Sequence, residues 1–318
     1  MKEISVIIPT HNGYSRGFLN EAIQSVLNQT FQDFELIIVD DGSTDLTSQL
    51  CKKFLSNNVF YIFQNNKGLA VARNTGILNS KGSYICFLDD DDIWEYCKLE
   101  KQYNFFKNIS DSQVGMVFTS IILIDEKGKE INSISHYADG NIFNDLLFNN
   151  IIDAPSSVMI KKEVFSKVGL FREEMKYVED YELWLRIAKN FNIYSLNEFL
   201  VKYRIHSNQM TRNNKKMEFY NLMALFLNLE NEDDKIADLS YKFLFSEYAI
   251  KHFWLNNYDQ FRKYYKIASV FGKLDFQLRI RFFLSYFKPI YRLLKIIQKK
   301  IFKNENSFCS YRRKYPYS

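Results

Sequence analysis

The sequence predicts an α/β fold in which a mostly parallel sheet is flanked by helices and followed by a C-terminal helical extension. Short apolar runs rich in β-branched residues alternate with amphipathic stretches over the first 90 residues. This alternation is typical of parallel strands joined by crossover helices. Polar and acidic clusters directly follow several of the runs, and from about residue 217 the pattern is almost entirely helical.

The elements of the first 90 residues follow one another at short intervals. We expect strands at residues 4–8, 34–39, 59–63 and 84–88. We expect helices at residues 18–27, 43–55 and 69–78, the second with Ser43 as its N-cap. The stretch 18–27 is apolar at positions 18, 19, 22, 23, 26 and 27, which form one stripe along a helix.

Beyond residue 110 the pattern is less regular. A β-rich run at 114–125 is expected to pair with 130–135 through a turn at 125–128. The other expected elements are a strand at 156–160, a helical turn at 163–168, a helix at 180–188 and a strand at 199–205.

Composition places the chain among ordinary globular proteins. Of its 318 residues, 47% are apolar and 25% are charged, which is enough for one large domain or two modest ones. The four cysteines include no C-x-x-C pair and only four histidines are present, which disfavours a Cys/His zinc site. The N-terminal apolar run is too short for a signal peptide, and no window reaches the ~18 apolar residues that span a bilayer. We therefore expect a cytoplasmic protein.

The net charge of +5 is concentrated at one end. Residues 273–318 contain twelve Lys and Arg against two acidic residues, so this end carries +10 and the rest carries −5. Across 276–303, apolar residues recur near helical spacing between basic ones, which predicts an amphipathic helix on the inner face of the cell membrane. The alternative is a helix packed on the body with a solvated basic face. Nucleic acid is not an expected partner, because the body is acidic and contains no nucleic-acid-binding motif.

The acidic run at residues 89–92 is the most informative local feature. It directly follows the fourth expected strand. Adjacent carboxylates repel one another unless a cation lies among them. At a strand end they form a hard oxygen site suited to Mg²⁺ or Mn²⁺, which would bridge the protein to a diphosphate. The alternative is a solvated acidic loop.

Four other residues have both a chemical and a structural interpretation. Asp41, after the second strand, either accepts a hydrogen bond from an N–H of a nucleotide base or belongs to a turn that ends the strand. Arg73 either contacts a nucleotide or balances the aspartates. Asp180 either caps a helix or acts as a general base, which would also require partial desolvation. His206 is either structural or part of a metal shell.

Six motifs in the right order resemble those of glycosyltransferase family 2, which has the GT-A fold. The resemblance covers roughly residues 3–210. The motifs are S-V-I-I-P-T-H-N-G at 5–13, Q-T-F at 29–31 with F-E-L-I-I-V-D-D-G-S-T-D at 34–45, N-K-G-L-A at 66–70 through A-R-N-T-G at 72–76, Y-I-C-F-L-D-D-D-D at 84–92 with Trp94, Y-V-E-D-Y-E-L-W-L-R at 177–186, and Y-R-I-H at 203–206. The family commonly has Pro shortly after this Trp, whereas W-E-Y-C-K-L at 94–99 lacks it. That departure lies in a loop and leaves the acidic motif intact.

The resemblance implies a domain organisation and a set of site residues. Residues 1–215 would form the GT-A domain, with a nucleotide-binding half at 1–110 and an acceptor half at 111–215, and residues 216–318 the helical C-terminal region. Asp180 would be the catalytic base. Asp91 would bind a divalent metal, Mn²⁺ or Mg²⁺, with His206 beside it. The other expected contacts to the nucleotide sugar are Pro9, Thr10, Asn12, Asp41, Arg73, Asp89 and Asp90.

The implied reaction is the inverting transfer of a sugar from a nucleotide sugar, with a UDP-sugar favoured, to a hydroxyl of a glycan or lipid-linked acceptor. Surface polysaccharide synthesis, such as that of capsule or lipopolysaccharide, is the expected setting. A non-catalytic nucleotide-sugar-binding relative is one alternative, and the intact Asp89, Asp91 and Asp180 argue against it. A sugar nucleotidyltransferase is another, but no Gly-rich phosphate loop follows the first strand. The absence of G-x-G-x-x-G there also disfavours a dehydrogenase.

Overall fold

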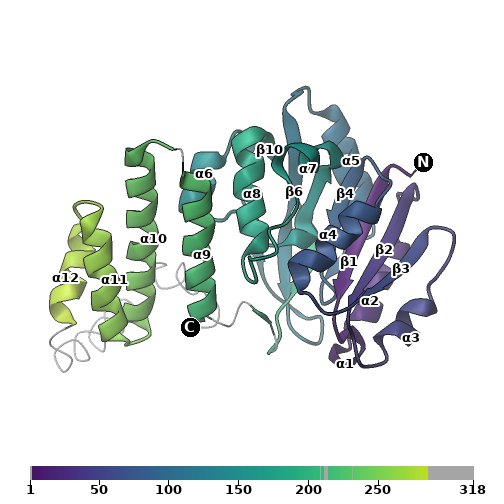
Figure 1. Cartoon of the computed structure of the whole chain (residues 1–318), viewed down its shortest axis with the longest axis horizontal. Coiled ribbons are helices and arrows are strands. Elements are labelled where there is room, and N and C mark those ends of the chain that lie inside the picture. The colour runs from purple at the N-terminus through teal and green to yellow at the C-terminus, as the bar shows by residue number, and fades with distance from the viewer. Residues whose placement is uncertain (1, 208, 211–213, 231, 286–318) are drawn as a thin grey trace. The chain divides into compact units, whose positions relative to one another are not determined.

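The computed structural model describes residues 2–207, 209–210, 214–230 and 232–285 of the chain (Figure 1). The chain divides into two compact units, Met1–Ala224 and Leu225–Ser318. The first unit is α/β and the second is helical within its described residues. The domain boundary expected after residue 215 stays a prediction.

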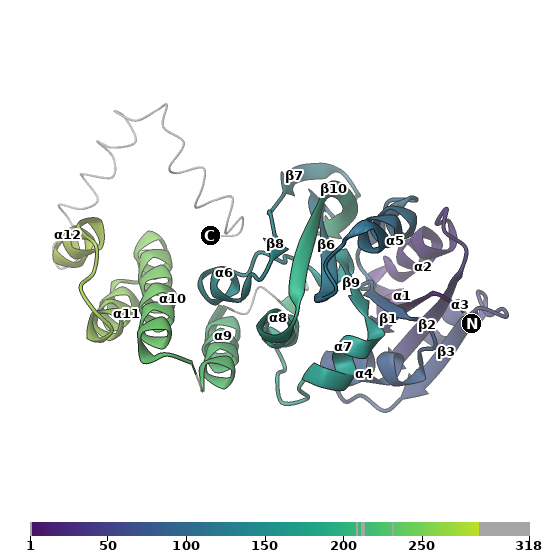
Figure 2. The same ribbon diagram turned by 90° about the horizontal axis from the view of Figure 1, so that it is seen from above.

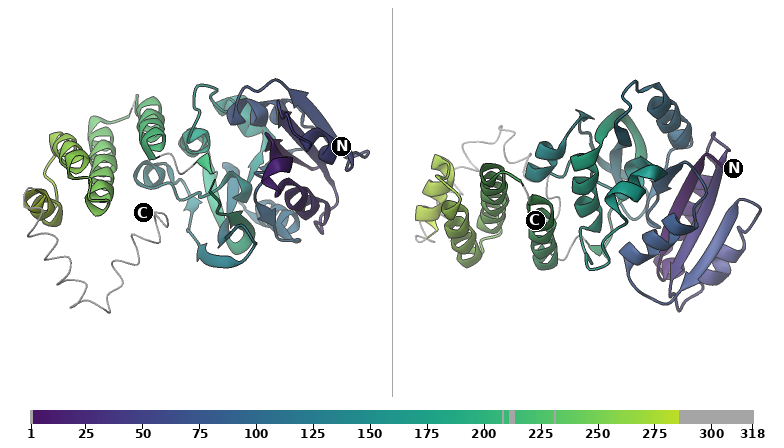
Figure 3. Two further views of the ribbon diagram at one scale, coloured as in Figure 1. Left: turned by 90° about the horizontal axis from the view of Figure 1, so that it is seen from below. Right: turned by 45° about the horizontal axis from the view of Figure 1, so that its top comes forward.

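The N-terminal half of the first unit is built on four parallel strands. They are β1 (Ile4–Thr10), β2 (Phe34–Asp41), β3 (Val59–Gln64) and β4 (Tyr84–Phe87). β1 pairs with β2 and β4, and β2 pairs with β3, in each case in parallel. These strands lie side by side next to the N-terminus in the right panel of Figure 3. The alternation of strands and helices in the sequence is thereby confirmed as a parallel sheet with crossovers.

The second half of the sheet mixes both directions. Within the described residues the order is β3-β2-β1-β4-β9-β6-β10-β5, with β7 beside β6 and β8 beside β10. β9 (Val158–Lys161) is antiparallel to both β4 and β6 (Val114–Ile124), whereas β10 (Asn192–Arg204) is parallel to β6. The expected hairpin is confirmed, because β7 (Glu130–Ile134) pairs antiparallel with β6. The short strands are β5 (Ile93–Trp94) and β8 (Asp139–Gly140), both antiparallel to β10.

Helices cover both faces of the sheet, as Figure 2 shows. On one side lie α2 (Leu19–Leu27), α3 (Thr47–Lys52) and α5 (Lys98–Asn108), and on the other lie α4 (Leu69–Asn79), α7 (Lys162–Val168) and α8 (Glu179–Asn190). The shorter helices of this unit are α1 (Gly13–Arg16), α6 (Phe143–Phe148) and the 3₁₀ turn η1 (Pro155–Ser157). α4 packs closely on β1, since a Cβ at Gly76 would lie 2.4 Å from Cγ2 of Ile7.

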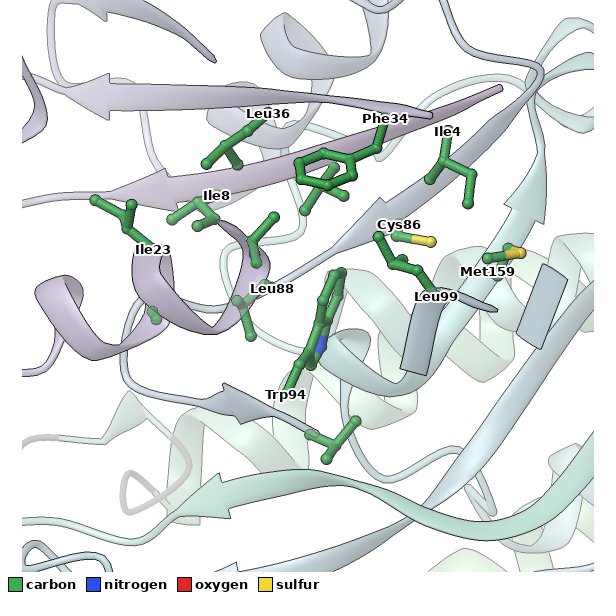
Figure 4. Close-up of a cluster of buried hydrophobic side chains, with 14 of the residues drawn as sticks. Ile4, Ile8, Ile23, Phe34, Leu36, Cys86, Leu88, Trp94, Leu99 and Met159 are labelled. Carbon is green, nitrogen blue, oxygen red and sulfur yellow. The ribbon is translucent and has the colours of Figure 1, made fainter. Parts of the chain in front are cut away.

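The main apolar cluster fills the space between the sheet and the first group of helices. Figure 4 shows Trp94 with Cys86 and Leu99 in this cluster, and Ile8 with Ile23 in another part of it. All five of these side chains are buried. Burial of this large apolar surface fixes the strand register. The register in turn sets which residues meet at the strand ends.

Several element boundaries differ from the sequence expectation, among them the strand expected at 199–205, which is β10 and begins at Asn192. α3 begins at Thr47 without a side-chain cap, so the expected N-cap at Ser43 is wrong. The Ser43 hydroxyl instead accepts a hydrogen bond from the backbone N–H of Asn12 at 2.8 Å, so it serves the loop after β1. The strand expected at 156–160 begins at Val158, because residues 155–157 form η1.

The second unit is helical within its described residues. It contains the end of α9 (Asn214–Leu229), α10 (Asp234–Trp254), α11 (Tyr258–Val270) and α12 (Phe276–Leu284). Asp233 caps α10 by accepting from the backbone N–H of Lys235. Most of the amphipathic helix expected at 276–303 lies outside the described residues. No helix in the described part of the chain combines the length and hydropathy needed to cross a bilayer.

Candidate active site

The site lies where the parallel strands end. Register pairs Thr10 at the end of β1 with Asp40 at the end of β2, and Ile7 with Phe87 of β4, so the segments after these strands meet at one edge. The Thr10 hydroxyl donates a hydrogen bond to Asp90, which confirms that the first and fourth strand ends converge. Ligands of open α/β sheets bind at such edges.

The loops after β1 and β2 form a connected set of hydrogen bonds. Pro9 is buried in β1 opposite Val39. Asn12 has left-handed backbone geometry (φ 53°), and its side-chain oxygen accepts from the N–H of Thr44 at 2.8 Å. Asp41 is buried and accepts from Gln64 Nε2 at 2.7 Å. It also accepts from the backbone N–H groups of residues 67 and 68, at 2.9 and 2.8 Å. The loops therefore form one preorganised cluster.

Burial alternates along the acidic run. The side chains of Asp89 and Asp91 are 24% and 18% exposed, whereas Asp90 and Asp92 are buried. Asp90 is held by Thr10 and Arg16. Burial, assisted by the charge of Asp91 and opposed by that of Arg16, raises the pKa of Asp90 to about 7.

Asp92 faces the interior of the protein. Its carboxylate accepts from the Ser156 hydroxyl at 2.5 Å and from the backbone N–H of Arg204 at 3.0 Å. Burial, with the neighbouring carboxylates of Asp91 and Asp89, raises its pKa well above the usual range. Within the run, Asp89 and Asp91 are therefore the two carboxylates that a ligand can reach.

Asp91 and His206, the two residues expected to hold a metal, lie next to each other. Asp91 Oδ2 lies 2.9 Å from Nε2 of the buried His206, whose ring lies 5.4 Å from that of Phe18. Within the described residues no group of three or more His, Cys, Asp and Glu side chains is arranged to hold a metal. Mg²⁺ commonly takes only one or two protein ligands and completes its shell with substrate phosphates and water. The Asp91 carboxylate fits a metal of that kind, and the His206 imidazole would add a softer nitrogen donor beside it.

Asp180 stands at the start of α8. This helix begins at Glu179 after Val178, which has left-handed backbone geometry (φ 60°), and no side chain caps it. Val178 is the N-cap residue, so Asp180 is the second residue of the helix and not its N-cap. Its side chain is partly buried, and its Oδ1 accepts from the backbone N–H of Tyr181 at 2.7 Å.

The surroundings of Asp180 give it the acidity of a useful base. Burial first, and the charge of Glu179 second, raise the pKa of Asp180 to about 7, while the charge of Arg73 opposes them. A general base works best when its pKa is near the operating pH. The partial desolvation that sequence reasoning required of Asp180 is present.

Arg73 links the two halves of the site. Its guanidinium is buried and donates to Asp89 Oδ1 at 2.6 Å and to Glu179 Oε1 at 2.5 Å. Of the two roles considered for Arg73, balancing acidic groups matches these contacts. A role in nucleotide binding stays a prediction.

Three further residues shape the site and were not singled out from the sequence. Arg204 donates from Nε to the backbone carbonyl of Asp91 at 2.9 Å, and Arg16 donates to the carbonyl of His11 at 3.0 Å. The Ser156 hydroxyl accepts from the Asp89 N–H at 3.1 Å and donates to Asp92. Only Arg204 carried a sequence signal, as part of the Y-R-x-H motif. A lone serine beside Pro155 carries none.

An α/β sheet whose edge gathers an acidic loop, tied through an arginine to a helix start that carries a carboxylate, is the arrangement that the resemblance to GT-A glycosyltransferases implied. The chain belongs to glycosyl transferase family 2, whose family profile matches residues 5–169.

Curated relatives agree with this membership. An uncharacterised glycosyltransferase of Rickettsia prowazekii is 32% identical over 240 residues, covering 73% of this chain and 74% of the relative. The putative teichuronic acid biosynthesis glycosyltransferase TuaG of Bacillus subtilis is 32% identical over 217 residues, covering 67% of this chain and 83% of TuaG.

Solved structures share the fold. The crystal structure of residues 1–349 of S. aureus TarS has a TM-score of 0.62 and 18% identity, with 89% of each chain covered. The same residues of TarS in complex with UDP-GlcNAc give a TM-score of 0.61, with 89% of this chain and 79% of that one covered. At this identity the likeness establishes the fold.

Proposed function

We propose that this glycosyltransferase moves a sugar from a UDP-sugar to a hydroxyl of a glycan or lipid-linked acceptor, with inversion at the anomeric carbon and Asp180 as the base. One observation carries the proposal. The partly buried Asp180, whose pKa is raised to about 7, follows Glu179, which Arg73 ties to Asp89 of the acidic loop. The base is thereby held close to the loop that would bind the donor.

The donor would lie along the ends of β1, β2 and β4. Thr10 and Asp41, with Pro9 and Asn12 in the same loop cluster, would contact the nucleoside. Asp89 would face the sugar and diphosphate, whereas Asp90, which is buried against Thr10 and Arg16, would hold the loop in place. The connected hydrogen bonds of this cluster support the role, because a preorganised site loses little conformational entropy when it binds.

The chemical step needs one proton transfer. Asp180 takes the proton from the acceptor hydroxyl while that oxygen forms its bond to the anomeric carbon. The bond from this carbon to the diphosphate oxygen breaks, and its electron pair leaves with UDP. Because the acceptor attacks opposite the leaving group, the configuration inverts. Holding both reactants in line supplies much of the rate enhancement of such a reaction.

A divalent metal, Mn²⁺ or Mg²⁺, would be held by Asp91 and His206. When bound, it would neutralise the negative charge that develops on the departing diphosphate. Asp91 supplies an accessible carboxylate, and Arg204 fixes the backbone of that residue. The 2.9 Å contact between His206 Nε2 and Asp91 Oδ2 keeps the two side chains adjacent, and a bound metal would replace this hydrogen bond.

The relatives suggest where the reaction belongs. UDP-GlcNAc, which the TarS structure contains, is the first donor to test. The similarity to TuaG, named for teichuronic acid biosynthesis, supports a role in surface polysaccharide synthesis. A lipid-linked acceptor would also suit the basic stretch at 276–303, through which the protein would contact a membrane surface as a peripheral protein.

Calorimetric titration of UDP with and without Mn²⁺ tests the donor site directly. We expect binding that depends on Mn²⁺ and falls by at least about tenfold in Asp91→Ala, because a carboxylate ligand is lost. UDP release from UDP-GlcNAc and other UDP-sugars then tests transfer. Asp180→Asn should bind UDP normally and lose about 10²–10⁴-fold in turnover.

The matched control is Asp145→Asn, which changes an exposed aspartate in the first turn of α6. It should leave both binding and turnover unchanged. Transfer at the wild-type rate by Asp180→Asn would refute the assignment of the base, and absence of UDP binding with either metal would refute the donor assignment.

A further inference from the structure

A buried arginine joins the two sides of the site. The Arg73 side chain is 1% exposed and bridges Asp89, at the end of β4, and Glu179, at the start of α8. Its Nε has no hydrogen-bond partner within the described residues, and its guanidinium carbon lies 5.5 Å from the ring centre of Phe171. Both of its strong contacts are therefore to carboxylates on either side of the candidate site.

Charged groups reach Asp180 from several elements. Glu179 precedes it on α8, Arg73 approaches from α4 and Asp89 from the end of β4. The phenol of Tyr203 on β10, a partly buried side chain, also interacts with the Asp180 charge. Glu179 and Asp89 disfavour the ionised form of Asp180, whereas Arg73 favours it. The protonation of Asp180 thus depends on a balance of opposite charges around it.

We infer that Arg73 and Glu179 form a positioning pair that sets the protonation state of Asp180, and that neither residue takes the acceptor proton itself. The geometry supports this division of labour. Glu179 is buried with an Oε1 that Arg73 holds at 2.5 Å, whereas Asp180 is partly exposed. The inference rests on the proposed role of Asp180 as the base.

The charges of Arg73 and Glu179 shift the pKa of Asp180 in opposite directions. Without the positive charge of Arg73, burial and Glu179 would keep Asp180 protonated at neutral pH, when it could accept no proton. Without the negative charge of Glu179, the guanidinium would act on Asp180 without a competing partner and make it a weaker base. Keeping both charges places the base between these limits.

A ¹³C NMR titration of the full chain, labelled at the aspartate carboxyl carbon, tests the inference without any substrate. The Asp180 signal is assigned by its loss in Asp180→Asn. In Arg73→Gln we expect its pKa to rise by about 1–3 pH units. In Glu179→Gln, which keeps the size of the side chain and removes only its charge, we expect the pKa to fall by about one pH unit or more. Arg73→Lys, which keeps the charge, should lie closer to the wild type than Arg73→Gln.

Glu182→Gln is the matched control. Glu182 is also buried on α8 and pairs with Arg172 and Arg186 at 2.9 and 2.7 Å, so its loss disturbs the same helix. We expect the pKa of Asp180 in Glu182→Gln to equal that of the wild type. If Arg73→Gln fails to fold, the isosteric Glu179→Gln still tests the inference, because an Asp180 pKa that stays unchanged or rises in this variant would overturn it.

Opposite changes in the two charge-removing variants would support the positioning pair. The inference would be overturned if the pKa of Asp180 changed in the same direction in both variants, or if it changed in neither. Failure of the proposed function gives a different result, because Asp180→Asn would then retain UDP-sugar turnover whatever the NMR titration shows.

Discussion

At the scale of single residues, the protein separates neighbouring carboxylates by burial. Asp89 and Asp91 stay accessible while Asp90 and Asp92 turn inward to Thr10 and Ser156, respectively. The same separation operates at the start of α8, where Glu179 is neutralised by an arginine and Asp180 is left with a raised pKa. Ionising Asp180 in the folded protein therefore costs free energy.

That cost predicts that Asp180→Asn stabilises the protein even though it lowers turnover. The pKa of Asp180 rises on folding from 3.8 to about 7. Asp180 therefore binds a proton more tightly in the folded state than in the unfolded state. The contribution of this proton to stability is fully present below about pH 4 and is lost as pH rises from about 4 to about 7. At pH 8 the amide variant should be more stable by roughly 2–4 kcal/mol.

Denaturant unfolding at pH 5 and pH 8 measures this difference. The gain in the free energy of unfolding of Asp180→Asn should be much smaller at pH 5 than at pH 8. At pH 5 Asp180 is still largely protonated in the folded wild type, so most of the cost of ionising it is absent. Asp145→Asn should show no such pH-dependent gain. A variant Asp180→Asn less stable than the wild type at pH 8 would show that the ionised carboxylate is favourably held, contrary to its raised pKa.

At the scale of elements, strand β9 and the turn before it bring the second half of the sheet into contact with the acidic loop. It inserts antiparallel between β4 and β6, and η1 just before it places Ser156 against Asp89 and Asp92. The Trp94 indole donates to the Ser156 carbonyl at 2.8 Å and fixes that turn from the other side. The acidic loop is therefore held by an element that follows it by more than 60 residues.

This contact predicts that Ser156→Ala weakens ligand binding as well as stability. Removing the hydroxyl leaves buried Asp92 without one of its donors, which costs about 1–3 kcal/mol of stability. Because the loop also carries Asp91, affinity for UDP in the presence of Mn²⁺ should fall by about tenfold, as measured by calorimetry.

Ser157→Ala provides the comparison. Ser157 is equally buried in the same turn, but its hydroxyl donates to the carbonyl of Ala154 at 2.7 Å instead of to the acidic loop. It should lose stability and keep UDP affinity. Equal losses of affinity in the two variants would mean that the turn acts only through folding.

At the scale of the whole molecule, adjacent residues on α4 connect the two halves of the first unit. Asn74 donates to the carbonyl of Phe171 at 2.9 Å and accepts from its N–H at 3.0 Å, next to the bridge that Arg73 makes. The chain also has a second unit, which is helical within its described residues and whose sequence ends in the basic stretch. Charge of this density near an apolar stripe favours an anionic surface.

We therefore expect the full chain to sediment with vesicles containing phosphatidylglycerol and to remain free of phosphatidylcholine vesicles. Changing Lys295, Lys299 and Lys300 to Gln should weaken this binding about 10²-fold, at about 1 kcal/mol for each charge. The matched control changes the exposed Lys52, Lys53 and Lys127 of the first unit to Gln. Equal weakening by both sets, or binding that persists at about 1 M salt, would contradict a specific role for the stretch.

The sequence by itself determined the class of fold and the edge of the sheet where the site lies. Apolar periodicity depends on local spacing, so it located the four parallel strands and the helices between them. Strand ends follow from the same pattern, and they placed Thr10, Asp41 and the acidic run together. Local signals failed where a polar side chain had two possible partners, as Ser43 did: it bonds to the loop after β1 and caps no helix.

The tertiary structure decided which charges meet. The partners of Arg73, Asp92 and Asp91 are 106, 64 and 115 residues away, at Glu179, Ser156 and His206. No local pattern encodes such distances along the chain. Burial and opposing charges also act only after the chain has packed, and they alone raise the pKa of Asp180. The motif located the candidate base, and packing gave it an acidity suited to that role.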